Sequence, residues 1–172
     1  MSAPGPQRRA AVTREDWETP PEVFGPLHDE FGFTLDAAAT AANAKCPLFI
    51  SVEQDALRDD VSWAALAGHR SFWLNPPYGR GLARWLRRCV VEANLDATGV
   101  SLLPANTDTL WFHEIVMATA DEVRFVRGRI SFLADGVPVK GNTGGSMVVV
   151  WRPYPRYRSR GPVVSSWHWS AR

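Results

Sequence analysis

The chain has 172 residues, of which 45% are hydrophobic and 11% aromatic, which suffices for one domain with a single packed core. It holds no apolar run of the roughly 18 residues needed to cross a bilayer and no segment resembling a signal peptide, so we expect a soluble cytoplasmic protein. Cys46, Cys89 and the four histidines form no spacing typical of zinc sites or redox dithiols. We therefore expect no metal and two buried free thiols.

The net charge of +1 hides an uneven distribution along the chain. Residues 1–14 hold three arginines and no acid, residues 15–60 have a balance of −9, and residues 61–172 have a balance of +7. No acidic side chain follows Asp135, and the proline-broken stretch 151–161 holds four arginines and two tyrosines. Such a tail suits a nucleic-acid backbone, and a solvated terminus is an equally good interpretation.

Three segments are expected: a flexible basic segment over 1–14, one domain over 15–153, and a basic aromatic tail over 154–172 that is mostly flexible. Within the domain, apolar residues recur at helical spacing between Pro20 and Gly32, which predicts the first helix. Further patterns predict strands at 33–36, 71–74, 99–105, 122–126 and 146–151, and helices at 81–93 and 109–120.

Strands separated by helices of about a dozen residues are typical of βαβ units, so the fold class predicted is α/β with a mostly parallel, doubly wound sheet. The last two strands are separated by a glycine-rich segment without helical periodicity. This segment favours an antiparallel hairpin at the sheet edge.

The strand at 71–74 runs into Asn75, Pro76, Pro77 and Tyr78. Consecutive prolines lack backbone donors, so the sheet must end there and hold Asn75 at its carboxyl edge, where open α/β sheets bind ligands. The Asn75 side-chain carbonyl and the Pro76 backbone carbonyl are two acceptors that suit an NH2 group. Tyr78 offers a face for stacking, which predicts a planar ring with an exocyclic amine, such as adenine. An Asx-type turn is the purely structural alternative.

Two acceptors at one amine also suggest a reaction. The lone pair of an adenine amine is delocalised into the ring, and accepting both N–H hydrogens would favour a pyramidal nitrogen that can attack an electrophile. No His-carboxylate or Ser-His arrangement stands near this motif to act as a base or nucleophile. The chemistry predicted therefore needs no strong base.

At these residues the sequence resembles the small phage-type DNA N6-adenine methyltransferases of the Dam-like family, for which NPPY is the catalytic signature. The likeness runs through "DWETPPEVFGPLHDEFGFTLDAAAT", "NAKCPLFIS", "DALRDDVSW", "WLNPPYG", "LLPANTDTLWFH", "VRFVRGRISF" and "GGSMVVVW", about residues 16–151. It implies a Rossmann-like class I methyltransferase fold, S-adenosyl-L-methionine as methyl donor, and a flipped adenine of DNA as acceptor. The setting implied is a bacterial or phage-infected host cell.

The resemblance also implies roles for single residues. Asn75 and Pro76 would hold the N6 amine, with Pro77 completing the motif and Tyr78 stacking on the base. The residues implied at the cofactor are Trp17, Thr19, Pro20, Asp36 and Asp55. Asp36 could instead cap the turn after its strand, Trp17 could be a hydrophobic staple, and Asp59 or Asp60 could take the place of Asp55.

Four arginines are candidate phosphate contacts at the rim of the pocket: Arg80, Arg84, Arg127 and Arg129. The alternatives are a solvated helix face for Arg80 and Arg84 and structural salt bridges for Arg127 and Arg129. Thr107 and Asp108 follow a strand at the same sheet edge, where they could line the pocket or lie at the start of the next helix.

Two departures limit what the resemblance implies. The loop "DAAATAAN" lacks the glycines usual after the first strand of methyltransferases, and alanine does not reach positive φ cheaply. No insertion is large enough for a target-recognition domain, which favours a short or relaxed DNA site. Methylation of an RNA base or a protein glutamine, and a non-catalytic nucleic-acid-binding relative, remain the alternative functions.

Overall fold

The computed structural model describes residues 17–139, 142–153 and 161–170. Its strands are β1 (Phe33–Asp36), β2 (Leu48–Phe49), β3 (Ser71–Leu74), β4 (Thr98–Pro104), β5 (Glu122–Val126), β6 (Leu133–Ala134), β7 (Val137–Pro138), β8 (Ser146–Trp151) and β9 (Val163–Trp167). Its helices are α1 (Pro21–Phe31), α2 (Trp63–Leu66), α3 (Leu82–Asn94), the π-helix η2 (Phe112–Val116) and α4 (Met117–Thr119).

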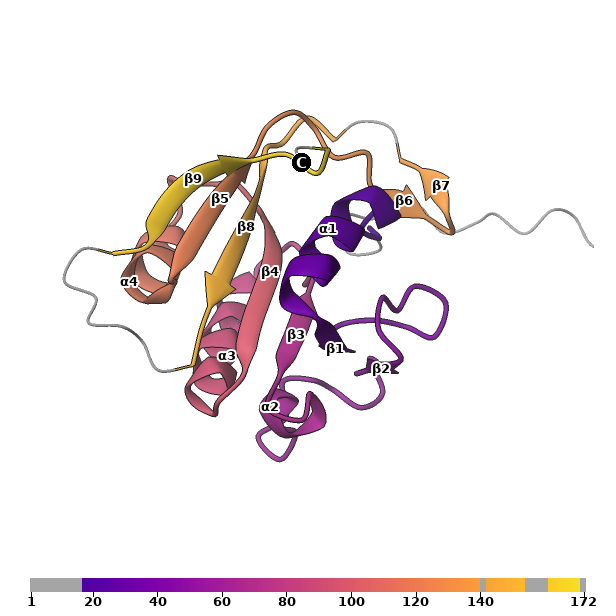
Figure 1. The fold of residues 1–172 in the computed structure, drawn as a ribbon, viewed down its shortest axis with the longest axis vertical. Helices are drawn as coiled ribbons and strands as arrows, with labels where there is room; N and C mark the ends of the chain where they lie inside the picture. Colours follow the sequence, from indigo (N-terminus) through magenta and orange to yellow (C-terminus); the bar gives the residue numbers. More distant parts are fainter. Residues whose placement is uncertain (1–16, 140–141, 154–160, 171–172) are drawn as a thin grey trace, which may run out of the picture.

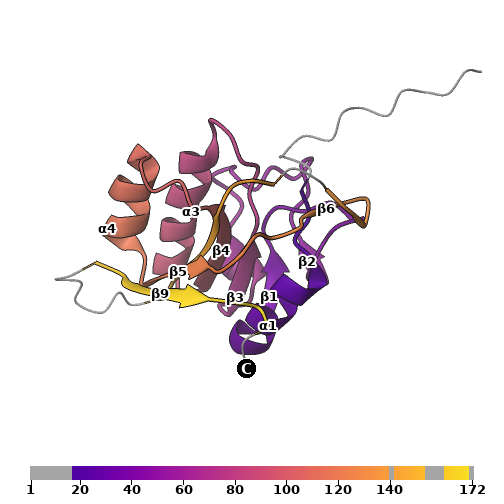
Figure 2. The same ribbon diagram turned by 90° about the horizontal axis from the view of Figure 1, so that it is seen from above.

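A seven-stranded sheet in the order β2–β1–β3–β4–β8–β5–β9 forms the centre of the fold (Figure 1). All neighbouring pairs are parallel except β4–β8 and β5–β8, so β8 alone among these strands runs against the others. Viewed from above, α3 and α4 lie on one face of the sheet and α1 on the other (Figure 2). The predicted α/β class with a mostly parallel, doubly wound sheet is confirmed.

The first helix begins and ends where the sequence predicts. Pro20 and Pro21 occupy its first positions, where a missing backbone N–H costs nothing. Gly32 ends it in the left-handed conformation with φ of 63°, and its N–H donates to the His28 carbonyl at 2.7 Å. Val23 and Leu27 are buried against the sheet.

Alternation along β3 divides the core into two layers. Trp73 packs in one cluster with Val23 of α1, whereas Phe72 and Leu74 pack in the other cluster with Leu86 of α3. All four residues of β3 are buried, because helices cover both faces of the sheet. The strand that leads into the NPPY motif therefore lies in the interior of the sheet, between β1 and β4.

The antiparallel pairing of β5 with β8 is confirmed, but the pair does not lie at the sheet edge. β8 is inserted between β4 and β5, and all six of its residues are buried. A strand as apolar as β8 is favoured in the interior of the sheet. The edge next to β5 is occupied by β9, which pairs in parallel with β5. A small separate hairpin, β6–β7, occupies part of the glycine-rich segment.

The chain after Pro153 was expected to be mostly flexible, and its described part includes a strand. Val163–Trp167 form β9, whereas 154–160 and the predicted flexible segment 1–14 lie outside the described residues. The helix predicted over 109–120 is present as η2 followed by α4. Among the described residues, no helix is long and apolar enough to span a bilayer.

Gly99 in β4 gives a test of this packing. A Cβ added there would lie 2.5 Å from Cζ of the buried Phe72 ring, which packs edge-on against Trp63 and has little room to move. We expect Gly99→Ala to lower the free energy of unfolding by about 1–3 kcal/mol in urea titrations.

Gly25→Ala in α1 is the matched control. A methyl group added at Gly25 would have no neighbouring atom within 4 Å, so helix propensity should raise stability by up to about 1 kcal/mol. Equal effects of the two substitutions would contradict this account of the β3–β4 contact.

Candidate active site

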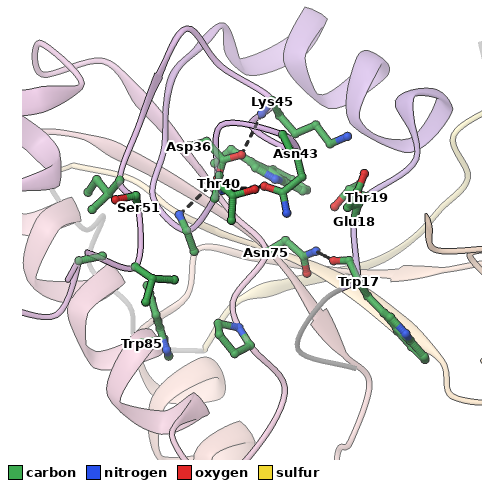
Figure 3. A pocket seen from close by; sticks show the side chains of 18 of the residues that line it. Trp17, Glu18, Thr19, Asp36, Thr40, Asn43, Lys45, Ser51, Asn75 and Trp85 are labelled. Carbon is green, nitrogen blue, oxygen red and sulfur yellow. Dashed lines mark hydrogen bonds between the residues drawn. The ribbon is translucent and has the colours of Figure 1, made fainter. Parts of the chain in front are cut away.

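A cavity of about 620 Å³ opens beside the ends of β1 and β3, within the size range of small-molecule sites. Its walls come from the segment before α1, the loops after β1, β2 and β3, the β6–β7 hairpin and α3 (Figure 3). The lining includes Trp17, Glu18, Thr19, Asp36, Thr40, Asn43, Lys45, Ser51, Asp55, Trp85, Asn75, Pro77 and Asp135. Parallel strands place their carboxyl ends at one edge, which explains why distant segments meet here.

Asn75 lies in this lining with its amide orientation fixed by one contact. Its Nδ2 donates to the backbone carbonyl of Trp17 at 2.8 Å (Figure 3). A carbonyl can only accept, so the amide nitrogen must face Trp17 and Oδ1 is left as an acceptor. Oδ1 is buried and has no hydrogen-bond partner among the described residues. An unsatisfied buried acceptor costs about 1–3 kcal/mol, and a ligand N–H could satisfy it.

The rest of the motif is divided between the cavity and the core. Pro77 lines the cavity, whereas Pro76 and Tyr78 lie outside its lining. The Tyr78 hydroxyl donates to the Leu102 carbonyl at 3.2 Å, and its ring meets Phe132 edge-on at 6.3 Å. Burial raises the pKa of the Tyr78 hydroxyl far above its usual range. The Tyr78 ring is thus partly buried against the core, and its stacking on a base stays a prediction.

The segment 17–19 is held against the β6–β7 hairpin. The Trp17 ring stacks on Phe132 at 5.0 Å, and the backbone of Glu18 exchanges hydrogen bonds of 2.8 and 3.0 Å with Leu133. Thr19 is 1% exposed, and its Oγ1 has no partner among the described residues. The predicted residues Trp17 and Thr19 thus reach the cavity, while Pro20 is outside its lining and is the N-cap residue before α1.

Asp36 organises the alanine-rich loop after β1. It is 3% exposed, and its carboxylate accepts from the backbone N–H of Ala38 at 3.3 Å and of Lys45 at 3.0 Å. Burial raises the pKa of Asp36 to about 6 despite these bonds. No residue between Asp36 and Lys45 has a positive φ, so this loop closes without glycine. Asp36 therefore both fixes the loop and lines the cavity.

Of the three neighbouring acids considered at the sequence level, Asp55 lines the cavity. It has a φ of 50°, and its Oδ1 accepts from the Leu57 N–H at 3.1 Å, a local turn that tolerates the left-handed conformation. Asp60 is instead paired with Arg58, and Asp59 is outside the lining.

The wall that carries Asp55 is held from α3. The carboxylate of Glu92, fully buried, accepts from the Ala64 N–H at 2.8 Å and pairs with Arg88 Nε at 2.6 Å. Arg88 also donates to the Val61 carbonyl. The Arg88 side chain thus turns onto the segment between Arg58 and Val61. The carboxylate of Glu92 is a buried charge that needs a partner, and Arg88 supplies it.

The candidate phosphate contacts lie outside the cavity. Arg80, Arg127 and Arg129 are exposed, with no ion pair to any described residue. Arg84 is exposed, and its Nη2 donates to the Leu57 carbonyl at 3.3 Å. Thr107 and Asp108 are exposed and do not line the cavity.

Sequence reasoning missed several lining residues, among them Glu18, Thr40, Asn43, Lys45 and Asp135. One sequence signal was available: Asp135 and Gly136 form an Asp-Gly pair, which is preferred in tight hairpins. In the structure both residues have positive φ, at 50° and 72°. No local pattern marks the other residues as lining a cavity, because only folding brings their loops together. Within the described residues, no group of three or more His, Cys, Asp or Glu is arranged to hold a metal.

The fold and the cavity at the strand ends define an α/β protein with a Rossmann-like methyltransferase architecture. The sequence matches the family model described as DNA N-6-adenine-methyltransferase (Dam) over residues 8–167, and the chain belongs to this family.

Two phage proteins named DNA N-6-adenine-methyltransferase are similar to this chain. The protein of Escherichia phage T1 is 31% identical over 158 residues, covering 82% of this chain and 64% of the phage protein, so the chain spans less than two thirds of that relative. The protein of Haemophilus phage HP1 is 32% identical over 147 residues, covering 83% of this chain and 82% of the relative.

Asp36 should make stability depend on pH in a defined window. Its pKa is about 6 in the folded chain against an ordinary value of 3.8, so the folded state binds the proton more tightly than the unfolded state. Raising the pH from below about 4 to above about 6 should therefore lower the free energy of unfolding, by about 3 kcal/mol in total.

Urea titrations of wild type and Asp36→Asn at several pH values would measure this effect. The asparagine side chain has one acceptor fewer, which shifts the free energy of unfolding of Asp36→Asn by the same amount at every pH. The dependence of the free energy of unfolding on pH comes from the Asp36 carboxyl alone. We expect the wild type to lose stability relative to the variant between pH 4 and 7. Parallel curves over that window would show that the Asp36 carboxyl has an ordinary pKa.

Proposed function

We propose that the protein transfers a methyl group from S-adenosyl-L-methionine to the exocyclic N6 of adenine in DNA, at a short recognition site. The observation that carries this proposal is Asn75 Oδ1, a buried and unpartnered acceptor in the cavity lining, oriented by the Trp17 carbonyl. Family membership and the names of the two phage relatives support the same acceptor.

The residues of the chain act on the amine by accepting its hydrogens. Asn75 Oδ1 and the Pro76 carbonyl accept hydrogen bonds from the two N–H groups of the amine. This favours a pyramidal nitrogen with an available lone pair. The bound cofactor supplies a methyl group on a sulfonium, a good leaving group. In the transfer, the C–S bond of the cofactor would break as the N–C bond forms, and the extra proton on nitrogen would pass to water. Neither carbonyl needs to act as a base.

The chemistry of the cavity fits this cofactor. Among the residues that the structure describes, four carboxylate side chains line it, from Glu18, Asp36, Asp55 and Asp135, against the single cation of Lys45. A predominantly acidic cavity favours a ligand that carries a sulfonium and an ammonium. Thr19 Oγ1 adds a buried hydroxyl without a partner among the described residues. Trp17, Thr19, Asp36 and Asp55 are therefore the proposed cofactor residues in the cavity, while Pro20 would fix the backbone after Thr19.

The acceptor has to leave the DNA stack to reach Asn75. An adenine inside a duplex cannot place N6 against a half-buried side chain, so we propose that the base is flipped. The exposed guanidinium groups of Arg80, Arg127 and Arg129 would then contact flanking phosphates. Arg84 would also contact a flanking phosphate while it keeps its hydrogen bond to the Leu57 carbonyl.

Removing the side chain of Asn75 tests the central assignment. We expect Asn75→Ala to lower methyl transfer into DNA at least about 100-fold, because an aligned acceptor is lost at the reacting nitrogen. Labelled S-adenosyl-L-methionine with unmethylated duplex DNA measures transfer, and calorimetry with S-adenosylhomocysteine should show that cofactor binding persists.

Asn94→Ala is the control, since Asn94 is exposed at the far end of α3. Near wild-type transfer by Asn75→Ala would remove the role given to Asn75. Label entering RNA or a glutamine-containing peptide but never DNA would favour the other acceptors. No cofactor binding by wild type would favour a non-catalytic relative.

Tyr78→Phe separates the ring from its hydroxyl. The ring remains for stacking, and the bond to the Leu102 carbonyl is lost. We expect the free energy of unfolding to fall by about 1 kcal/mol and transfer to stay within a few-fold of wild type. Urea titration and the labelled-methyl assay measure the two quantities. A folded Tyr78→Phe protein without transfer would assign the function to the hydroxyl instead.

A further inference from the structure

We propose that Lys45 binds the carboxylate of the methionine part of S-adenosyl-L-methionine and thereby selects cofactors that carry this group. The inference rests on the proposed function, and it assigns a ligand contact to Lys45, a residue to which the family resemblance gave no role. It follows from the position of Lys45, from the charge of the cavity and from a second unpartnered group on the opposite wall.

The backbone of Lys45 is fixed while its side chain stays available. Its N–H donates to Asp36 Oδ2 at 3.0 Å, which closes the loop after β1. The side chain is half-buried and extends from that loop towards Glu18 and Thr19 (Figure 3). The ammonium makes no hydrogen bond or ion pair with any described residue. Its charge attracts the Asp36 carboxylate and partly offsets the rise that burial causes in the pKa of that group. This attraction acts without a direct contact, so the ammonium can bind a ligand without breaking a hydrogen bond or ion pair.

The charges of the cavity distinguish where each part of the cofactor can lie. The ligand carries two positive groups, the sulfonium and the ammonium, and one negative group, the carboxylate. The carboxylates of the lining can offset the positive groups, but they would repel the carboxylate of the ligand. Lys45 is the one cationic side chain among the described lining residues, so the ligand carboxylate is bound favourably beside it.

Thr19 supplies the second observation. Its Oγ1 is buried and has no partner among the described residues, and a hydroxyl can donate to a carboxylate. Thr19 lines the same cavity as Lys45, in the direction in which the Lys45 side chain extends (Figure 3). An ammonium and a hydroxyl donor facing one another suit a carboxylate bound between them.

Two ligands that differ only in the carboxylate test the proposal by isothermal calorimetry. S-Adenosylhomocysteine keeps the carboxylate and the ammonium, and its decarboxylated analogue keeps only the ammonium. We expect Lys45→Met to weaken S-adenosylhomocysteine binding about tenfold or more, because a charge-assisted contact is lost. Binding of the decarboxylated analogue should stay within about twofold of wild type or tighten, since a like charge is removed.

Lys45→Arg keeps the charge and should retain most of the preference for the carboxylate. Arg87→Met is the control outside the cavity, because Arg87 is exposed on α3. Lys45→Met keeps the backbone N–H that holds Asp36, and its melting temperature without ligand should stay near wild type. Measuring at pH 8 keeps Asp36 ionised in both proteins.

The outcomes separate this proposal from the proposed function. Equal weakening of both ligands by Lys45→Met would overturn the carboxylate contact while leaving the methyltransferase assignment intact. Unchanged binding of both would overturn it as well. If wild type binds neither ligand, the proposed function fails and the carboxylate contact fails with it.

Discussion

The hydrogen bond from Asn75 Nδ2 to the Trp17 carbonyl is the contact on which the site depends. It turns an amide that could point either way into a defined acceptor at the end of an interior strand. It also joins the segment before α1 to the NPPY motif, although 58 positions separate the two residues. Trp17 in turn stacks on Phe132, so the orientation of Asn75 is coupled to the packing of the segment that leads into the β6–β7 hairpin.

A second constraint is the burial of charge around the cavity. Asp36 is kept at the end of β1 by two backbone donors, and its raised pKa records what burial costs its charged form. Glu92 and Arg88 form a buried pair that holds the opposite wall. Neither arrangement favours stability as strongly as an apolar core would. Both fix the walls of a cavity whose net negative charge a cationic ligand would partly offset.

The loop after β1 closes without glycine. Methyltransferase loops at this place usually use glycine, and this chain has "DAAAT". No positive φ occurs between Asp36 and Lys45, so alanine carries no backbone penalty here. The loop is closed by side-chain acceptors instead: Asp36 binds two backbone N–H groups, and the Asn43 amide oxygen accepts from the Thr40 N–H at 2.7 Å.

The sequence by itself determined the elements and the position of the motif. Helical spacing between Pro20 and Gly32 and the two prolines after β3 are local signals, because capping and missing donors act within a few residues. Only the tertiary structure decided that β8 lies between β4 and β5, that β9 takes the edge, and that Lys45 and Glu18 line the same cavity. Contacts between segments far apart in the chain depend on packing, which no local pattern encodes.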